Sequence, residues 1–248
     1  MNDPTTHSAD QIGGLIAMIA HDLRSPITAI KGFSQLALRQ SDLSPQVHNY
    51  LSVVLNETNR VAAMIDDLVL LSELDQNTTI PSTALVIDGI LQAAIRRSMR
   101  FDSTTEIVLE KNPIGVMVRC HPALTERAVA LLIGTARKYC LRSERITVCA
   151  HTEGDGVLIT VLPSGHVATE KLLALRRVVG AKTAVPTDDL SPSGLGLFIC
   201  RQLIELQGGQ VWIEQPTNGS TKFAIMLPGH TERHPKQTPP RGERQQWS

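Results

Sequence analysis

The chain has 248 residues, its 24 lysines and arginines are balanced by 24 aspartates and glutamates, and only 3% of its residues are aromatic. This length allows one large domain or two small ones with a buried core. The zero net charge argues against a general polyanion binder, and the scarcity of aromatics argues against a base-stacking platform, so we expect no nucleic acid among the partners.

Cysteine spacing and hydropathy bear on the cellular compartment. The four cysteines have no CxxC spacing, which predicts reduced, partly buried thiols rather than a zinc ribbon or a disulfide framework. The longest apolar stretch, residues 15–20, is far shorter than the roughly 18 residues of a membrane helix. The polar start before it lacks the basic region of a signal peptide. We therefore predict a cytoplasmic protein with no membrane partner.

Residues 11–76 are predicted to form a helical hairpin, after a flexible N-terminus at 1–10. Apolar residues recur at helical spacing from about 10 to 40, and a second stripe advances by alternating steps of four and three from 47 to 72. Ser44 and Pro45 suit the cap and the first position of the second helix. One hairpin has too little core to stand alone, so we expect a homodimer in which two hairpins form a four-helix bundle.

The second half of the chain, residues 84–228, mixes helices and strands after a linker at 77–83. Gly208 and Gly209 are typical of the cap that ends a helix, and the tail at 229–248 is polar enough to be disordered. The pattern indicates an α+β layer. The predicted helices are 84–99, 122–141, 169–179 and 195–207, and the predicted strands are 105–109, 116–120, 146–151, 157–162, 210–215 and 221–227.

The first helix contains the segment AHDLRSPITAIKGF, in which Asp22 directly follows His21. A histidine beside an apolar stripe is more often a satisfied side chain than a reactive one. Here, however, Asp22 can accept the Nδ1 proton and leave Nε2 as a nucleophile, and Arg24 can balance negative charge nearby. Pro26 removes a helical hydrogen bond and bends the helix one turn beyond His21.

This segment resembles the H-box of the sensor histidine kinases of two-component signalling, whose usual form is H-E/D-L-R-T/S-P-L/I. The resemblance implies that His21 accepts a phosphoryl group, that Asp22 is its acid–base partner, and that the hairpin is a dimerisation and phosphotransfer domain. Family members that also dephosphorylate their partner carry Thr or Asn four residues after the histidine to position a water. Ser25 holds that place here.

A glycine segment, Gly194-Leu195-Gly196, precedes the last predicted helix. Glycines at a helix N-terminus can cradle phosphate with backbone N–H groups, although glycines also persist where a helix and a sheet pack closely. The stretch SGLGLFICRQLIELQGGQVWIE, together with GSTKFAIMLP, resembles the G2 box and closing hairpin of histidine-kinase ATP-binding domains. The resemblance implies a GHKL (Bergerat-type) α/β sandwich that uses ATP and Mg²⁺.

Two further boxes of the family are altered. The N-box, usually N-L-L-x-N-A-x-K-Y, aligns with LLIGTARKY at 131–139, where Lys138 and Tyr139 fit but Thr135 replaces the asparagine that binds Mg²⁺. Leu131 replaces the other asparagine. The D-x-G-x-G box aligns with PSGHV at 163–167, so Pro163 replaces the adenine-binding aspartate and Gly165 alone remains. No phenylalanine-containing F-box precedes the glycine segment. The sequence predicts a degraded nucleotide site.

Three functions remain open. The favoured one is a phosphotransferase or pseudokinase in which His21 exchanges a phosphoryl group with an aspartate of a response-regulator receiver domain. The second is an ATP-dependent autokinase with a divergent site, and Thr135 and Pro163 weigh against it. The third is a non-catalytic dimeric scaffold, which has no chemical need for the His21–Asp22 pair. The residues before the first helix leave no length for a sensor, so we expect input from a partner such as a sensor protein or another histidine kinase, from the tail, or from the degraded domain itself.

Overall fold

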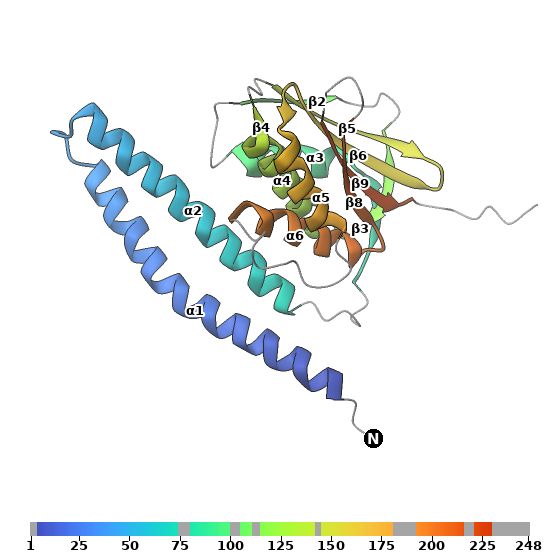
Figure 1. Cartoon of the computed structure of the whole chain (residues 1–248), viewed down its shortest axis with the longest axis horizontal. Helices are drawn as coiled ribbons and strands as arrows, with labels where there is room; N and C mark the ends of the chain where they lie inside the picture. Colours follow the sequence, from blue (N-terminus) through green and yellow to red (C-terminus); the bar gives the residue numbers. More distant parts are fainter. Residues whose placement is uncertain are drawn as a thin grey trace, which may run out of the picture.

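The computed structural model describes residues 4–73, 80–99, 105–110, 115–141, 145–180, 192–215 and 221–229. Two long helices, α1 (Pro4–Leu38) and α2 (Pro45–Glu73), run side by side as an antiparallel hairpin (Figure 1). The Val47 N–H donates to Ser44 Oγ at 3.3 Å, and Pro45 is the first helical residue, as predicted. α1 begins at Pro4, inside the segment 1–10 for which the sequence predicts no helix.

The rest of the described chain forms an α/β layer. Its main sheet has five strands in the order β2-β5-β6-β9-β8, in which β2 and β5 are parallel and the other pairs are antiparallel. The helices are α3 (Asp88–Met99), α4 (Pro122–Tyr139), α5 (Thr169–Gly180) and α6 (Pro192–Glu205). The strands are β1 (Thr83–Val86), β2 (Glu106–Glu110), β3 (Met117–Cys120), β4 (Cys140–Leu141), β5 (Arg145–Glu153), β6 (Gly156–Pro163), β7 (His166–Val167), β8 (Gln210–Glu214) and β9 (Lys222–Pro228).

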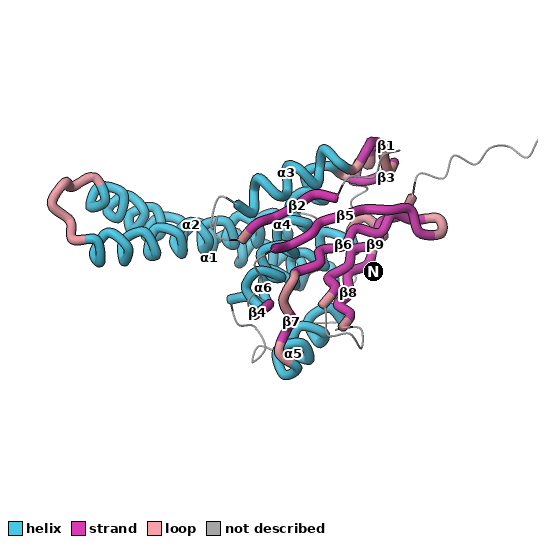
Figure 2. Tube along the Cα trace, turned by 90° about the horizontal axis from the view of Figure 1, so that it is seen from above, coloured by secondary structure: helices cyan, strands magenta, loops and turns pink. Residues whose placement is uncertain are grey.

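The core of the layer lies between the main sheet and the helices that cover one of its faces (Figure 2). Alternate residues of β5 are buried, among them Ile146, Val148 and Ala150, because one side of this strand faces the helices. β6, between β5 and β9, is buried along almost its whole length. Gly208, with a φ of 74°, follows the end of α6, and its N–H and that of the next glycine donate to carbonyls of that helix, as the glycine pair predicts.

The sequence-based prediction is wrong at three short strands. Residues 84–86, expected to begin a helix, belong to β1, which pairs antiparallel with β3. Asp88 then opens α3, where an acidic side chain suits the first turn. β4 and β7 form a separate antiparallel pair, so the helix predicted to reach residue 141 ends at Tyr139. Of the tail predicted at 229–248, Gly229 forms a bridge with Val118 and donates to the Asp155 carbonyl, and residues 230–248 lie outside the described part of the chain.

The hairpin and the layer meet along α2. Figure 1 shows α2 between α1 and the layer, with α6 as the nearest helix of the layer. Many large apolar side chains of the hairpin are exposed in the single chain, among them Phe33 at 72%, Leu36 at 59% and Tyr50 at 58%. In the described part of the chain, no helix carries an apolar stretch long enough to cross a membrane.

Candidate functional site

His21 projects from α1 into solvent. Its side chain is 84% exposed, and its Nδ1 lies 3.3 Å from Oδ1 of Asp22, which is 75% exposed. When Nδ1 carries the proton it donates to this carboxylate, and Nε2 then keeps its lone pair. The geometry therefore presents Nε2 as an accessible nucleophile beside an acidic partner.

The two following candidates lie on the same exposed stretch of α1. Arg24 donates from Nη2 to Oδ1 of Asp66 on α2 at 2.8 Å, and both side chains are about half exposed. The sequence places Arg24 near negative charge but gives no sign that its partner is Asp66. Ser25 is exposed, and Thr28 Oγ1 donates to the Arg24 carbonyl at 2.7 Å, next to the backbone that Pro26 interrupts.

The predicted glycine cradle differs in form from the expectation. α6 begins at Pro192, so Gly194, Leu195 and Gly196 lie inside its first turns rather than ahead of it. Both glycines are buried. A Cβ at Gly196 would meet Leu131 Cδ2 of α4 at 3.6 Å, an ordinary contact distance. The glycine segment thus forms part of the α6 surface that packs against α4.

The residues aligned with the N-box are held within α4. Thr135 is 5% exposed, and its Oγ1 donates to the Leu131 carbonyl at 2.8 Å. Tyr139 packs against the core of the layer. Desolvation lowers the pKa of Lys138, and the positive charge of Arg60 on α2 acts in the same direction. The Thr135 hydroxyl is thus buried in α4 and hydrogen-bonded to the backbone of its own helix.

The residues aligned with the adenine-binding box lie at the end of β6. Pro163 is buried and pairs with Ile146 of β5, and Gly165 is half-buried in the bend that follows. Proline has no side-chain acceptor for an adenine amino group. No group of three or more His, Cys, Asp or Glu side chains within the described ranges is arranged to hold a metal ion. At positions 135 and 163 the chain therefore has a threonine and a proline where the family resemblance implies an asparagine and an aspartate.

His21 and the glycine segment are not brought together. His21 lies on α1, the glycines lie on α6, and α2 passes between these helices (Figure 1). The structure instead contains an ion pair that the sequence does not reveal, between Asp67 of α2 and Arg127 of α4. Neither residue belongs to a recognisable motif, so only the docking of the layer on the hairpin makes the pair visible.

Both parts of the chain match family models. Residues 11–77 match the His Kinase A (phospho-acceptor) domain, and residues 120–231 match the family described as histidine kinase-, DNA gyrase B-, and HSP90-like ATPase. The described structure has a hairpin in the first range and most of the α/β layer in the second.

Three curated relatives align with most of this chain, which spans less than half the length of each of them. The sensor protein KdpD of Clostridium acetobutylicum is 23% identical over 86% of this chain and 24% of its own length. The sensor protein CreC of Escherichia coli K12 is 24% identical over 86% of this chain and 44% of its own length. The sensor protein SrrB of Staphylococcus aureus N315 is 26% identical over 90% of this chain and 39% of its own length.

Two solved structures share the fold. Full-length ShkA, crystallised in complex with AMPPNP, superposes with a TM-score of 0.58 at 19% identity, covering 87% of this chain and 46% of ShkA. The histidine kinase AdeS of Acinetobacter baumannii gives a TM-score of 0.52 at 15% identity, covering 85% of this chain and 98% of that chain. At such identities the likeness establishes the fold alone.

Proposed function

Because the chain belongs to the two-component histidine kinase family, we propose that it carries a phosphoryl group on His21 and exchanges it with an aspartate of a response-regulator receiver domain. Family membership and the fold, a helical hairpin followed by a GHKL α/β domain, agree with the sequence-based prediction. The observation that carries the proposal is the exposed His21 side chain, with Nδ1 in contact with Asp22.

The proposed exchange uses His21 and Asp22 of this chain and the aspartyl phosphate of the partner. Nε2 attacks phosphorus, an N–P bond forms, and the P–O bond to the aspartyl carboxylate breaks, so that the electron pair leaves with the carboxylate. Nδ1 retains its proton and donates it in a hydrogen bond to Asp22, which balances the positive charge on the phosphorylated ring. The reverse reaction returns the phosphoryl group to the partner. The 84% exposure of His21 leaves room for a docked receiver domain.

We propose further that nucleotide recognition is weakened. ATP, when bound by this fold, supplies the phosphoryl donor, and the AMPPNP complex of ShkA supports ATP as a ligand of the family. In this chain, however, Thr135 is 5% exposed and has no amide oxygen, and Pro163 has no carboxylate. The loss of one charge-assisted hydrogen bond reduces affinity by about ten- to a hundredfold. These residues favour a phosphotransferase or pseudokinase over an efficient autokinase.

A homodimer through the hairpin accompanies this proposal. Two hairpins that share one core would bury the apolar side chains that a single hairpin leaves in water. Such side chains occur on both helices and not on one alone. They are Met18, Ile19, Leu23, Ile30, Phe33, Leu36, Val47, Tyr50, Val53, Val54 and Val61.

The deciding experiment follows acid-labile, alkali-stable phosphate on the purified chain. The wild type and His21→Gln are incubated separately with Mg-ATP and with a phosphorylated receiver domain. We expect label on the wild type from the receiver, little from ATP, and none on His21→Gln. Rapid labelling from ATP would instead identify an autokinase. Label from neither source, with His21→Ala still binding the receiver, would identify a non-catalytic scaffold.

A further inference from the structure

A buried ion pair joins the hairpin to the α/β layer. Arg127 of α4 donates from Nε to Oδ1 of Asp67 on α2, and the two side chains are only 17% and 4% exposed. Desolvation lowers the pKa of Arg127, while the negative charge of Asp66 raises it. A carboxylate as buried as that of Asp67 is stable in its charged form only while a cation is next to it. The pair therefore ties the position of α4 to that of α2.

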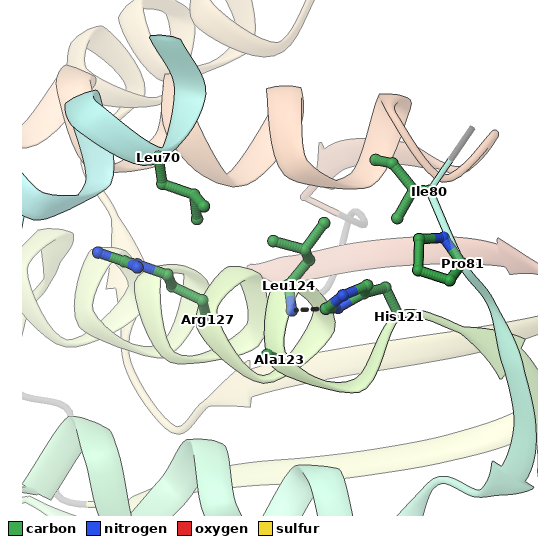
Figure 3. Close-up of a pocket in the computed structure, with 7 residues that line it drawn as sticks. All are labelled: Leu70, Ile80, Pro81, His121, Ala123, Leu124 and Arg127. Atoms are coloured by element: carbon green, nitrogen blue, oxygen red, sulfur yellow. Dashed lines mark hydrogen bonds between the residues drawn. The ribbon is translucent and has the colours of Figure 1, made fainter. Parts of the chain in front are cut away.

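The contact around this pair is otherwise incompletely filled. Leu70, one turn beyond Asp67, packs against the core of the layer, and a hollow of about 260 Å³ lies beside it (Figure 3). The lining residues come from α2, from α4 and from the segment that precedes β1, and they are Leu70, Ile80, Pro81, His121, Ala123, Leu124 and Arg127. A boundary that holds a buried ion pair beside an unfilled, mostly apolar hollow is loosely packed, as is typical of domains that move relative to one another.

The neighbouring carboxylate, that of Asp66, binds an arginine on α1, the other helix of the hairpin. Asp66 accepts from Arg24 of α1, whereas Asp67 accepts from Arg127 of the layer. These adjacent acidic residues thus bind two arginines on different elements, one of them three residues after His21. Loss of the exposed Arg24–Asp66 pair should change stability little, whereas removal of one partner of the Asp67–Arg127 pair would leave the other charge buried and uncompensated.

We propose that Asp67 and Arg127 form a releasable clasp that holds the α/β layer on α2. With the clasp closed, α2 lies between α6 and α1 (Figure 1), which keeps the glycine segment of α6 away from His21. The His21 side chain is 84% exposed in this arrangement. With the clasp open, the layer is free to leave α2. The clasp itself is independent of the proposed phosphotransfer, and only its consequence for His21 rests on that function.

The test measures docking of the full chain in Arg127→Gln, with Arg96→Gln on the exposed surface of α3 as the matched control. Hydrogen–deuterium exchange is followed in peptides covering 60–73 and 121–131, and small-angle X-ray scattering gives the overall dimensions. We expect Arg127→Gln to raise the undocked-to-docked ratio by roughly a hundredfold, because the charge of Asp67 is left buried and unpaired. Hydrogen–deuterium exchange in β5 and β6 of Arg127→Gln should match that of the wild type. The control Arg96→Gln should match the wild type in both exchange and scattering.

A second pair of variants keeps the test decisive if Arg127→Gln unfolds the layer. Asp67→Asn alters only the hairpin and should produce the same undocking, and the charge swap Asp67→Arg with Arg127→Asp should restore docking at least in part. Wild-type exchange and scattering in both Arg127→Gln and Asp67→Asn would overturn the clasp. Because no phosphate enters these measurements, the clasp can stand even if His21 is never labelled.

Discussion

Leu131 of α4 faces Gly196 of α6 so that a Cβ at position 196 would meet Leu131 Cδ2 at 3.6 Å. Packing therefore does not require glycine there, and Gly196→Ala should stabilise α6 by up to about 1 kcal/mol. At Gly209 an added Cβ would lie 2.4 Å from the Met226 carbonyl oxygen, so Gly209→Ala should destabilise by about 2 kcal/mol or more. Denaturant titrations compare the two variants. Equal destabilisation would show that close packing requires glycine at both positions.

Restoring a carboxylate at the end of β6 tests the weakened adenine site. Pro163→Asp should raise the affinity for adenine nucleotides about ten- to a hundredfold over Pro163→Ala, because a carboxylate can again accept from the adenine amino group. Calorimetry with ATP measures both variants. Micromolar ATP binding by the wild type would contradict the assignment of a degraded site, whatever the variants do.

A charge on the apolar surface of α1 should separate the proposed dimer. Phe33 is 72% exposed in the single chain, and Phe33→Asp should weaken dimerisation by roughly a hundredfold, since both copies lose a buried aromatic ring. Leu173→Asp on α5 is the control, because Leu173 is 53% exposed but belongs to the layer. Sedimentation at several concentrations separates the outcomes. A monomeric wild type would exclude the dimer.

The carboxylate beside His21 should matter for transfer rather than for folding. Asp22 is 75% exposed, so Asp22→Asn should leave the free energy of unfolding within about 0.5 kcal/mol of the wild type. It should slow phosphoryl exchange with the receiver at least about tenfold, because the charged ring loses its counter-ion. Asp42→Asn, in the turn between the helices, controls for a general effect of lost charge. Equal rates in all three proteins would remove Asp22 from the mechanism.

Burial of cysteine thiols predicts that the folded protein becomes less stable at alkaline pH. Burial raises the pKa of Cys140 from an ordinary 9.0 to about 12, and the pKa values of Cys120 and Cys200 are also raised. The folded state then keeps a proton that the unfolded chain releases. This stabilisation is complete below pH 9 and is lost as the pH rises towards 12. At pH 10 the loss from Cys140 is about 1 kcal/mol.

Denaturant titrations at pH 8 and pH 10 test this prediction. Cys140→Ala should show a smaller fall in stability between these pH values than Cys149→Ala, the control at a half-buried position. A fall in stability of the same size in both variants would contradict a raised pKa of Cys140.

Periodicity and capping residues are sufficient to predict most elements of this fold. The alternation in β5, the Ser44 cap and the Gly208–Gly209 stop depend on local chemistry, so they can be read from neighbouring residues. β1 could not be predicted, because its strand character depends on pairing with β3, more than thirty residues away.

The same division holds at the candidate site. The contact between His21 and Asp22 joins adjacent residues and follows from the H-box resemblance. The partners of Arg24 and Arg127 lie on other elements, and no local pattern distinguishes Asp66 or Asp67 from an ordinary exposed helix face. Long-range ion pairs of this kind emerge only when the helices are docked.

Pro26 changes the backbone hydrogen bonding beside His21. An α-helical carbonyl accepts from the N–H four residues later, and for Asp22 that residue is Pro26, which has no N–H. The main chain next to His21 therefore presents a carbonyl oxygen whose helical donor is missing. The proline thus leaves one backbone acceptor of α1, next to His21, outside the hydrogen-bond ladder of its own helix.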